Sequence, residues 1–303
     1  MMKELKFDRS EPDGFGHALQ VSPLIMRLVA PNAGPFTFTG TCTYLVGDNP
    51  LIVIDPGPDD EQHLRALREA IGDRSVSHIL VTHTHKDHSP LARRLAELTG
   101  AEILGATPHK AARALNEGEI NLLDASADYD HKPSRILHDG EILRIAGLTI
   151  EVVATPGHTM NHLAFALKED QALFSGDHVM AWSTSIVAPP DGAMSAYMQS
   201  LKKLLPRSET IYWPGHGGPV KEPYHFVQGL IAHRKSREAS ILAALSATPV
   251  RIPDLVSQIY IGLADQLKGA AALSVFAHLE DLVARRFVAT DGEPRLSGLY
   301  RLM

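Results

Sequence analysis

The sequence predicts an α/β protein with a small, separate C-terminal domain. Between residues 23 and 219, short apolar runs typical of buried strands alternate with amphipathic patterns typical of helices. After residue 250 the order changes to helices followed by a hairpin. A chain of 303 residues, 44% of them hydrophobic, is long enough to bury one large core and one small one.

An N-terminal arm and the first strands are expected before any motif. Residues 1–22 are polar, carry a turn signal at residues 11–14, and are expected to lie as an arm on the large domain, which would span residues 23–219. Apolar runs typical of strands occupy residues 24–29, 44–46 and 51–55. Asp55 ends the last run before a Pro-Gly pair, where it can support a neighbouring loop from behind or simply form the turn.

A loop with four possible metal ligands follows the next strand. The apolar run at residues 79–81 leads into a segment that contains His83, His85, Asp87 and His88. Ser89 and Pro90 are then expected to start a helix over residues 91–98, with Ser89 as its N-cap. Histidine and carboxylate side chains supply the N and O ligands that Zn²⁺ takes at about 2.0–2.2 Å. The loop is therefore predicted to bind metal; a surface loop merely rich in His and Asp is the alternative.

Three more strand ends present a histidine or an aspartate. His158, Asp177 and His216 each follow a glycine, and the apolar runs before them lie at residues 148–153, 172–173 and 210–212. Loops at strand ends are where α/β scaffolds carry chemistry. Seven such side chains are too many for one tetrahedral ion but fit two ions that share a carboxylate.

The order of these residues resembles the metallo-β-lactamase superfamily. Its signature is His-x-His-x-Asp-His, then Gly-His, Gly-Asp and Gly-His, which here fall at residues 83–88, 158, 177 and 216. The resemblance implies an αββα sandwich with two divalent metal ions, zinc being expected, at one edge of the sheets. It assigns His83, His85 and His158 to the first metal, Asp87, His88 and His216 to the second, and Asp177 to a bridge between them. Family members use a metal-bridging hydroxide as nucleophile.

Two further roles follow from the motifs. Asp55 stands in a run that resembles the family's second motif, where a carboxylate supports the ligand loop. Asp87 is also a catalytic candidate, because it can orient the attacking water.

Hydrolysis is favoured over redox chemistry, since His85 stands where oxygen-reducing di-iron relatives carry a carboxylate. Antibiotic hydrolysis is disfavoured, since Asp177 stands where true metallo-β-lactamases usually have cysteine. The only cysteine, Cys42, has no disulfide partner and is not expected to be a nucleophile.

A connecting helix within residues 220–250 and a winged helix over residues 251–303 are expected next. The centre of the connecting helix carries Arg234, Lys235 and Arg237, and a solvated or salt-bridged helix face is favoured over an anion-binding patch. The C-terminal part has six Lys and Arg against six Asp and Glu, and Glu280 and Asp281 lie on the helix that would enter DNA. Duplex DNA binding is not expected, because neutralisation of phosphates by Lys and Arg dominates such affinity.

This tail sharpens the resemblance. Residues 31–37 and 40–47, and residues 231–234 with Arg237 and Glu238, look like the β-lactamase-like-protein branch related to glyoxalase II. That branch includes a single-strand-preferring endoribonuclease and polyketide-type thioesterases. Three departures from its pattern leave the ligands intact: Cys42 in place of Asn, Ser89-Pro90 in place of a Gly pair, and Asn161 in place of Asp.

The sequence thus favours a metal-dependent hydrolase that acts on an ester, thioester or lactone, with a small-molecule or acyl-carrier substrate. One alternative is an endoribonuclease on single-stranded RNA, for which only Arg234, Lys235 and Arg237 offer a basic channel. Another is a non-enzymatic regulator or adaptor with a structural metal site. A single cysteine, no apolar stretch of about 20 residues and no secretory signal lead us to expect a cytoplasmic protein without a membrane partner. The oligomeric state is left open.

Overall fold

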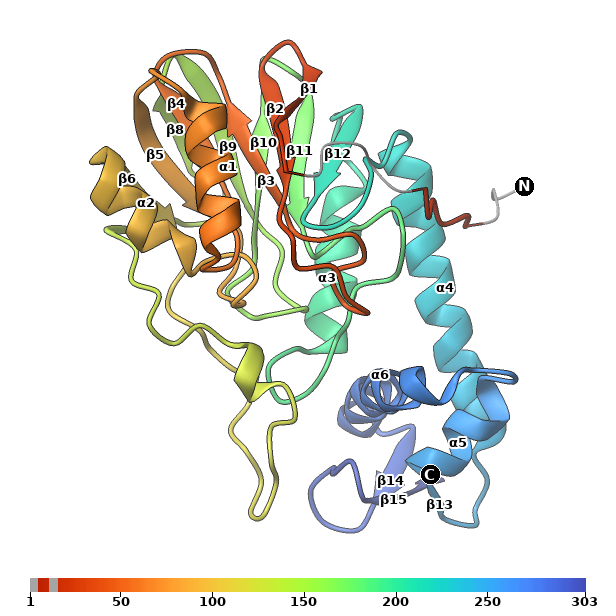
Figure 1. Ribbon diagram of the computed structural model, residues 1–303. Helices are drawn as coiled ribbons and strands as arrows, with labels where there is room; N and C mark the ends of the chain where they lie inside the picture. The colour runs from red at the N-terminus through yellow and green to blue at the C-terminus, as the bar shows by residue number, and fades with distance from the viewer. Residues whose placement is uncertain (1–4, 11–15) are drawn as a thin grey trace.

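Two β-sheets lie face to face in the large domain, and helices cover both outer faces (Figure 1). In this computed structural model, residues 5–10 and 16–303 are described. One sheet has the strand order β1 (Leu19–Ser22), β2 (Ile25–Val29), β3 (Cys42–Val46), β4 (Leu51–Ile54), β5 (Val76–Val81), β6 (Glu102–Gly105), β7 (Arg135–Ile136). The other has the order β12 (Ile211–Pro214), β11 (Ala172–Gly176), β10 (Leu163–Leu167), β9 (Leu148–Ala154), β8 (Ile142–Ile145). The predicted αββα sandwich is confirmed.

Three apolar layers hold the sandwich together. Side chains such as Tyr44, Phe165 and Phe174 fill the space between the sheets. Helices α1 (Glu61–Ile71) and α2 (Leu91–Thr99) pack on the outer face of the first sheet, and α3 (Met194–Leu204) and α4 (Pro223–Ala244) on that of the second. Successive strand residues alternate between layers: Leu45 faces the outer helices while Tyr44 faces the inner core. The strands are apolar on both faces and therefore appear in the sequence as continuous hydrophobic runs.

The sheet topology brings the motif loops to one edge. Strand β4 pairs in parallel with β5, and β11 pairs in parallel with β12. Strand β9 runs in the same direction as β11, because each is antiparallel to the intervening β10. The segments that follow these strands, which hold Asp55 and the predicted ligands, therefore leave the sandwich at its carboxyl edge.

The C-terminal residues form a separate unit beyond the long helix α4 (Figure 1). It contains α5 (Ile252–Ile259), α6 (Asp265–Ala284) and a three-stranded sheet of β13 (Val250–Arg251), β15 (Leu299–Leu302) and β14 (Val288–Thr290). Its own core includes Leu255, Phe276 and Tyr300. The predicted winged helix is confirmed, although α6 starts six residues before the apolar run at 271–283 that indicated it.

Helix α6 is the helix that would enter DNA in a DNA-binding winged helix, and here it faces the large domain. Ala277 of α6 belongs to the core that α3 and α4 form with the second sheet. Glu280 accepts a hydrogen bond of 2.8 Å from Arg113 Nε, so it serves an interdomain ion pair. Asp281 pairs with Arg285 at 2.9 Å within the helix. The side of α6 that would enter a DNA groove is therefore partly used for packing.

The N-terminal arm is shorter than the sequence suggested. Leu19–Ser22, expected within the arm, form β1. This strand pairs with β2, with Leu19 opposite Arg27, and so extends the first sheet. Residues 5–10 do lie on the large domain: Phe7 meets Phe226 of α4 with ring centroids 6.2 Å apart. The turn signal at residues 11–14 lies outside the described residues.

Ser89 does not cap α2, contrary to expectation. The residue before the helix is Pro90, which makes no side-chain capping bond. Ser89 Oγ instead donates to Asp128 Oδ2 at 2.6 Å, a partner 39 positions away. The hydroxyl thus joins the ligand loop to a distant segment. It gives the buried Asp128 carboxylate a hydrogen-bond donor, and leaving that carboxylate without one would cost more free energy than leaving the helix uncapped.

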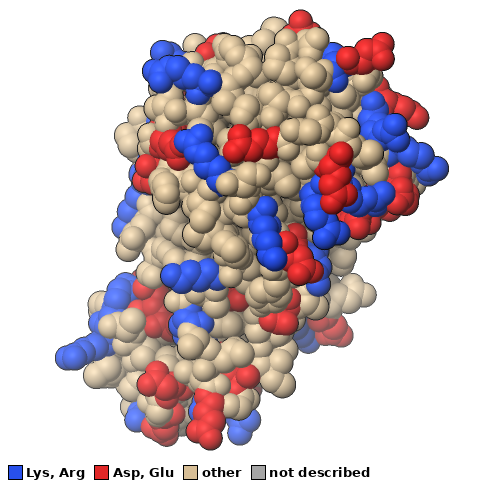
Figure 2. Space-filling view, turned by 90° about the vertical axis from the view of Figure 1, so that its left-hand side faces the viewer, with Lys and Arg blue, Asp and Glu red and all other residues tan. Residues whose placement is uncertain are grey.

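The intact chain is expected to show at most weak, non-specific binding to duplex DNA. Helix α6 faces the large domain, and on the face drawn in Figure 2 basic and acidic side chains are interspersed. We expect dissociation constants above about 1 µM at physiological salt, the non-specific range. Fluorescence anisotropy with a salt titration measures this. Submicromolar binding with a steep negative salt slope would contradict it.

No helix in the described part of the chain is long and apolar enough to cross a membrane.

Candidate metal centre

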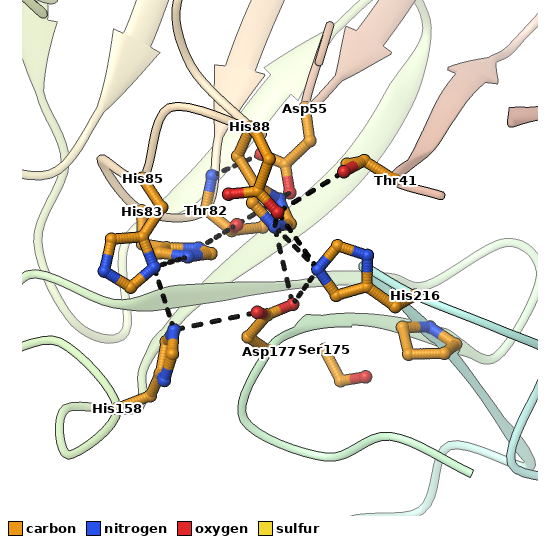
Figure 3. Close-up of polar contacts among 12 residues, drawn as sticks. Thr41, Asp55, Thr82, His83, His85, His88, His158, Ser175, Asp177 and His216 are labelled. Atoms are coloured by element: carbon orange, nitrogen blue, oxygen red, sulfur yellow. Dashed lines mark hydrogen bonds and ion pairs between the residues drawn. The ribbon is translucent and has the colours of Figure 1, made fainter. Parts of the chain in front are cut away.

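Loops from both sheets bring the seven predicted ligands into one cluster, and Figure 3 labels all of them except Asp87. The loop after β5 supplies four of them, and the segments after β9, β11 and β12 supply one each. Their donor atoms form three groups within which all distances are at most 4.8 Å: His83, His85 and His158; His83, His88 and Asp177; Asp87, His88 and His216. Residues that span 133 positions of sequence (216 − 83) therefore meet at one point.

The first predicted set contains only imidazoles. His85 Nδ1 lies 3.0 Å from His83 Nε2 and 3.0 Å from His158 Nε2. Burial and the neighbouring histidines hold the pKa of His83 well below its usual range, and burial lowers that of His85 to about 3. Both rings are therefore neutral at pH 7, the form in which imidazole binds a metal.

The second predicted set contains the charges. Asp87 Oδ2 lies 3.2 Å from His216 Nε2 and 3.4 Å from His88 Nε2. Burial alone would raise the pKa of Asp87, but His88 and His216 hold it well below its usual range. Burial opposes protonation of His216, yet Asp177 and Asp87 raise its pKa to about 9. The two carboxylates thus demand positive charge at this position, which protons or a metal ion can supply.

Asp177 lies between the two sets. Its Oδ1 is 3.4 Å from both His88 Nε2 and His216 Nε2, and its Oδ2 is 3.6 Å from His158 Nε2. Oδ1 is buried and accepts no hydrogen bond from the described residues. One carboxylate oxygen therefore faces each set, as a bridging ligand requires.

The outer nitrogens of the rings show that the cluster fits metal ions. His158 Nδ1 donates to the Ile186 carbonyl at 2.6 Å, and His216 Nδ1 donates to the Gly40 carbonyl at 3.2 Å. Carbonyl oxygens only accept, so each of these two rings carries a proton on Nδ1 and turns Nε2 inward. Ring nitrogens that converge in this way need a cation among them, and either a proton or a metal ion can provide it. The nitrogen and oxygen donors suit Zn²⁺ or a similar divalent ion.

Asp55 supports the ligand loop. It leaves β4 with a left-handed φ of 47° and is only 2% exposed. Its Oδ1 accepts from Thr82 N at 2.7 Å, and its Oδ2 accepts from Thr82 Oγ1 at 2.7 Å and His88 Nδ1 at 2.9 Å. Of the two roles considered for Asp55, these contacts favour support of the loop over formation of a turn alone.

His162 is a member of the site that sequence reasoning missed. Its Nδ1 lies 2.8 Å from Thr155 Oγ1, and its Nε2 accepts from the backbone N of Asp177 at 3.1 Å. Burial keeps the pKa of His162 well below its usual range, so the ring is neutral and can accept that bond. A signal was present, because His162 closes the run that starts at Gly157 and His158.

Thr41 was also missed as a contact of the centre. Its Oγ1 is 3.4 Å from Asp87 Oδ2, and it is held by Asn32 Nδ2 at 2.9 Å. The next residue, Cys42, is fully buried in the core between the sheets, and burial raises the pKa of its thiol. Its position supports the expectation that Cys42 is not a nucleophile.

Two family models match the chain. The Metallo-beta-lactamase superfamily model matches residues 36–216, more than half of the sequence. The chain belongs to this superfamily. The model of the Beta-lactamase associated winged helix domain matches residues 252–295. The family resemblance drawn from the ordered motifs is therefore confirmed.

Relatives within the metallo-β-lactamase superfamily extend over most of the chain. Lactamase-like protein adaB of Aspergillus niger is 29% identical over 91% of this chain and 85% of its own length. Atrochrysone carboxyl ACP thioesterase dmxR1 of Cryptosporiopsis sp. is 31% identical over 75% of this chain and 64% of its own length. The crystal structure of a metallo-beta-lactamase family protein from Thermus thermophilus has a TM-score of 0.76 at 24% identity, covering 93% of this chain and 100% of that one. That structure shares the fold.

Replacement of Asp55 by asparagine should weaken metal binding without unfolding the protein. The amide keeps the shape but must turn a donor toward Thr82 or His88, so a contact behind the ligands is lost. Loss of such a partner costs about 10–100-fold in metal affinity. Competition with a chelator measures it. Asp60→Asn is the matched control, because Asp60 caps α1 through His63 N at 2.8 Å and asparagine caps equally well. Equal affinities in the two variants would contradict the role of Asp55.

Replacement of Asp177 by alanine should remove the link between the two sets. If Asp177 bridges, the wild type is expected to hold about two metals per chain and the alanine variant no more than about one. Asp177→Asn, which keeps one carbonyl oxygen, should lie between them. Elemental analysis against protein concentration measures this. About two metals retained in Asp177→Ala would show that the bridge is not needed.

Proposed function

We propose that this protein is a dinuclear metal-dependent hydrolase whose substrate is an acyl thioester or a related ester. The observation that carries the proposal is the position of Asp177, whose two carboxylate oxygens face different sets of donor atoms. A structural site would be satisfied by one closed set of four ligands. Seven donors arranged around a shared carboxylate favour a reactive centre over the regulator or adaptor alternative.

The residues of the chain would divide the work. The imidazole rings of His83, His85 and His158 would hold the first ion, and Asp87, His88 and His216 the second. Bound divalent ions lower the pKa of water and stabilise charge on the attacked oxygen. The side chain of Asp87 is 25% exposed, against 9% for Asp177, so Asp87 can orient an incoming water while Asp177 only binds.

An acyl thioester is favoured by two considerations. Relatives such as the dmxR1 protein are named as acyl-carrier-protein thioesterases, although the matched region spans only 64% of that protein. The endoribonuclease alternative needs a basic channel, and Arg234 is 3% exposed and buried against other residues. The expectation of a solvated or salt-bridged helix face is therefore wrong for Arg234. Its buried guanidinium is not accessible to an RNA phosphate.

A substrate panel tests the proposal. Acyl-coenzyme A thioesters, a lactone, a simple ester and short single-stranded RNA are offered to one zinc-loaded sample of measured metal content. We expect thioester hydrolysis that is lost on chelation and restored by zinc, because the donor set fits divalent ions.

Two variants sharpen this test. Asp87→Ala should lower kcat by about two orders of magnitude or more, because it removes a ligand and the residue that orients water. Cys42→Ala should keep most activity, since the thiol is buried. RNA cleavage without thioester hydrolysis, or activity that survives metal removal, would overturn the proposal.

A further inference from the structure

Arg234 of α4 is a buried cation that no carboxylate of the described residues pairs with. It is 3% exposed, and its partners are a carbonyl, a hydroxyl and an aromatic ring. Burying a guanidinium without an acid is costly. The contacts with its three neutral partners must offset this cost, and each of them connects Arg234 to a different part of the molecule.

The first partner leads to His158. Arg234 Nη2 donates to the carbonyl of Ser185. The next residue, Ile186, accepts the 2.6 Å hydrogen bond from His158 Nδ1 that sets the tautomer of this ring. Arg234 thus fixes the segment whose backbone orients a ligand of the first set.

The second partner leads to the backbone on both sides of the centre. The Arg234 guanidinium lies 5.1 Å from the ring centroid of Tyr197. Tyr197 packs so closely on Gly157 that a Cβ added there would be 2.4 Å from Tyr197 Cα, and Gly157 directly precedes His158. The Tyr197 hydroxyl donates to the carbonyl of His178 at 3.1 Å, and His178 directly follows Asp177.

The third partner lies in the C-terminal domain. Arg234 Nη1 donates to Ser274 Oγ of α6 at 3.2 Å. Helix α6 also contributes Ala277 to the core that contains Tyr197. A shift of α6 would therefore change the contacts of Arg234 directly. The other predicted set is supported elsewhere, by Asp55 behind His88 and by the Gly40 carbonyl behind His216.

We propose that Arg234 is a positioning residue that couples the docking of the winged helix to His158 and Asp177. The C-terminal domain then acts as a brace for the metal centre. This rests on the proposed function, since it takes His158 and Asp177 as ligands. Loss of Arg234 should weaken the first set more than the second, because only the first depends on the Ser185 and Ile186 segment.

Arg234→Met tests the coupling, and Arg237→Met is its matched control. Arg237 lies one turn further along α4, 4.1 Å from the ring centroid of Tyr260, and donates to the carbonyl of Ile259 at 3.5 Å, so both of these contacts are with the C-terminal domain. We expect Arg234→Met to lower the affinity for one metal per chain about tenfold or more, the size of effect that outer contacts have on ligands. The absorption bands of the Co²⁺-loaded protein should change as well. Arg237→Met should bind metal as the wild type does.

Two milder variants keep the test independent of misfolding. Arg234→Lys keeps the charge and one donor, so it should recover part of the affinity. Ser274→Ala removes only the contact with α6 and should shift affinity and spectrum in the same direction by less. A folded Arg234→Met with wild-type affinity and spectrum, or equal losses in Arg234→Met and Arg237→Met, would overturn the coupling. A wild-type protein that binds no metal would instead overturn the proposed function.

Discussion

The carboxylate of Asp55 is the contact on which the ligand loop depends. Strands β4 and β5 pair in parallel with Ile54 opposite Leu80, so the chain leaves both strands at the same height. Asp55 can therefore reach Thr82 and His88, and its buried charge is satisfied by donors from the loop. Breaking a buried charged contact of this kind costs about 3–5 kcal/mol. The loop can hold converging ring nitrogens because it is anchored from behind.

The two predicted sets of ligands are supported by different parts of the fold. The second set is supported by Asp55, which directly follows β4, and by the carbonyl of Gly40, which lies two residues before β3. The first set depends on His158, whose support comes from the irregular segment at Ile186 and, through it, from α4. The second set is thus supported by segments next to the strands, whereas the first is connected to α4, which covers the second sheet.

Whether a feature could be predicted from the sequence depends on how far apart along the chain the contacting residues lie. Four of the predicted ligands lie in the loop directly after β5, and His158, Asp177 and His216 each follow a strand and a glycine, so strand, turn and donor lie within a few residues of one another. The seven donors, the αββα sandwich and the winged helix could all be inferred from such runs and their order. Ser89 and Arg234 are different, because the partners that decide their roles, Asp128 and Ser185, lie 39 and 49 positions away. No local pattern distinguishes a helix cap from a distant tie, or a solvated arginine from a buried one.

The contacts of α6 with the large domain disfavour binding of this winged helix to duplex DNA. To present α6 to DNA, the domain would have to give up the ion pair between Arg113 and Glu280 and the bond between Arg234 and Ser274. Glu280 would then meet phosphates with its negative charge, and Arg234 would stay buried with one partner fewer. Both changes are unfavourable, whereas the docked arrangement gives Glu280 a cation and Arg234 a second hydrogen-bond acceptor. The bond between Arg234 and Ser274, which holds α6 away from DNA, is also the contact through which we propose that α6 influences His158.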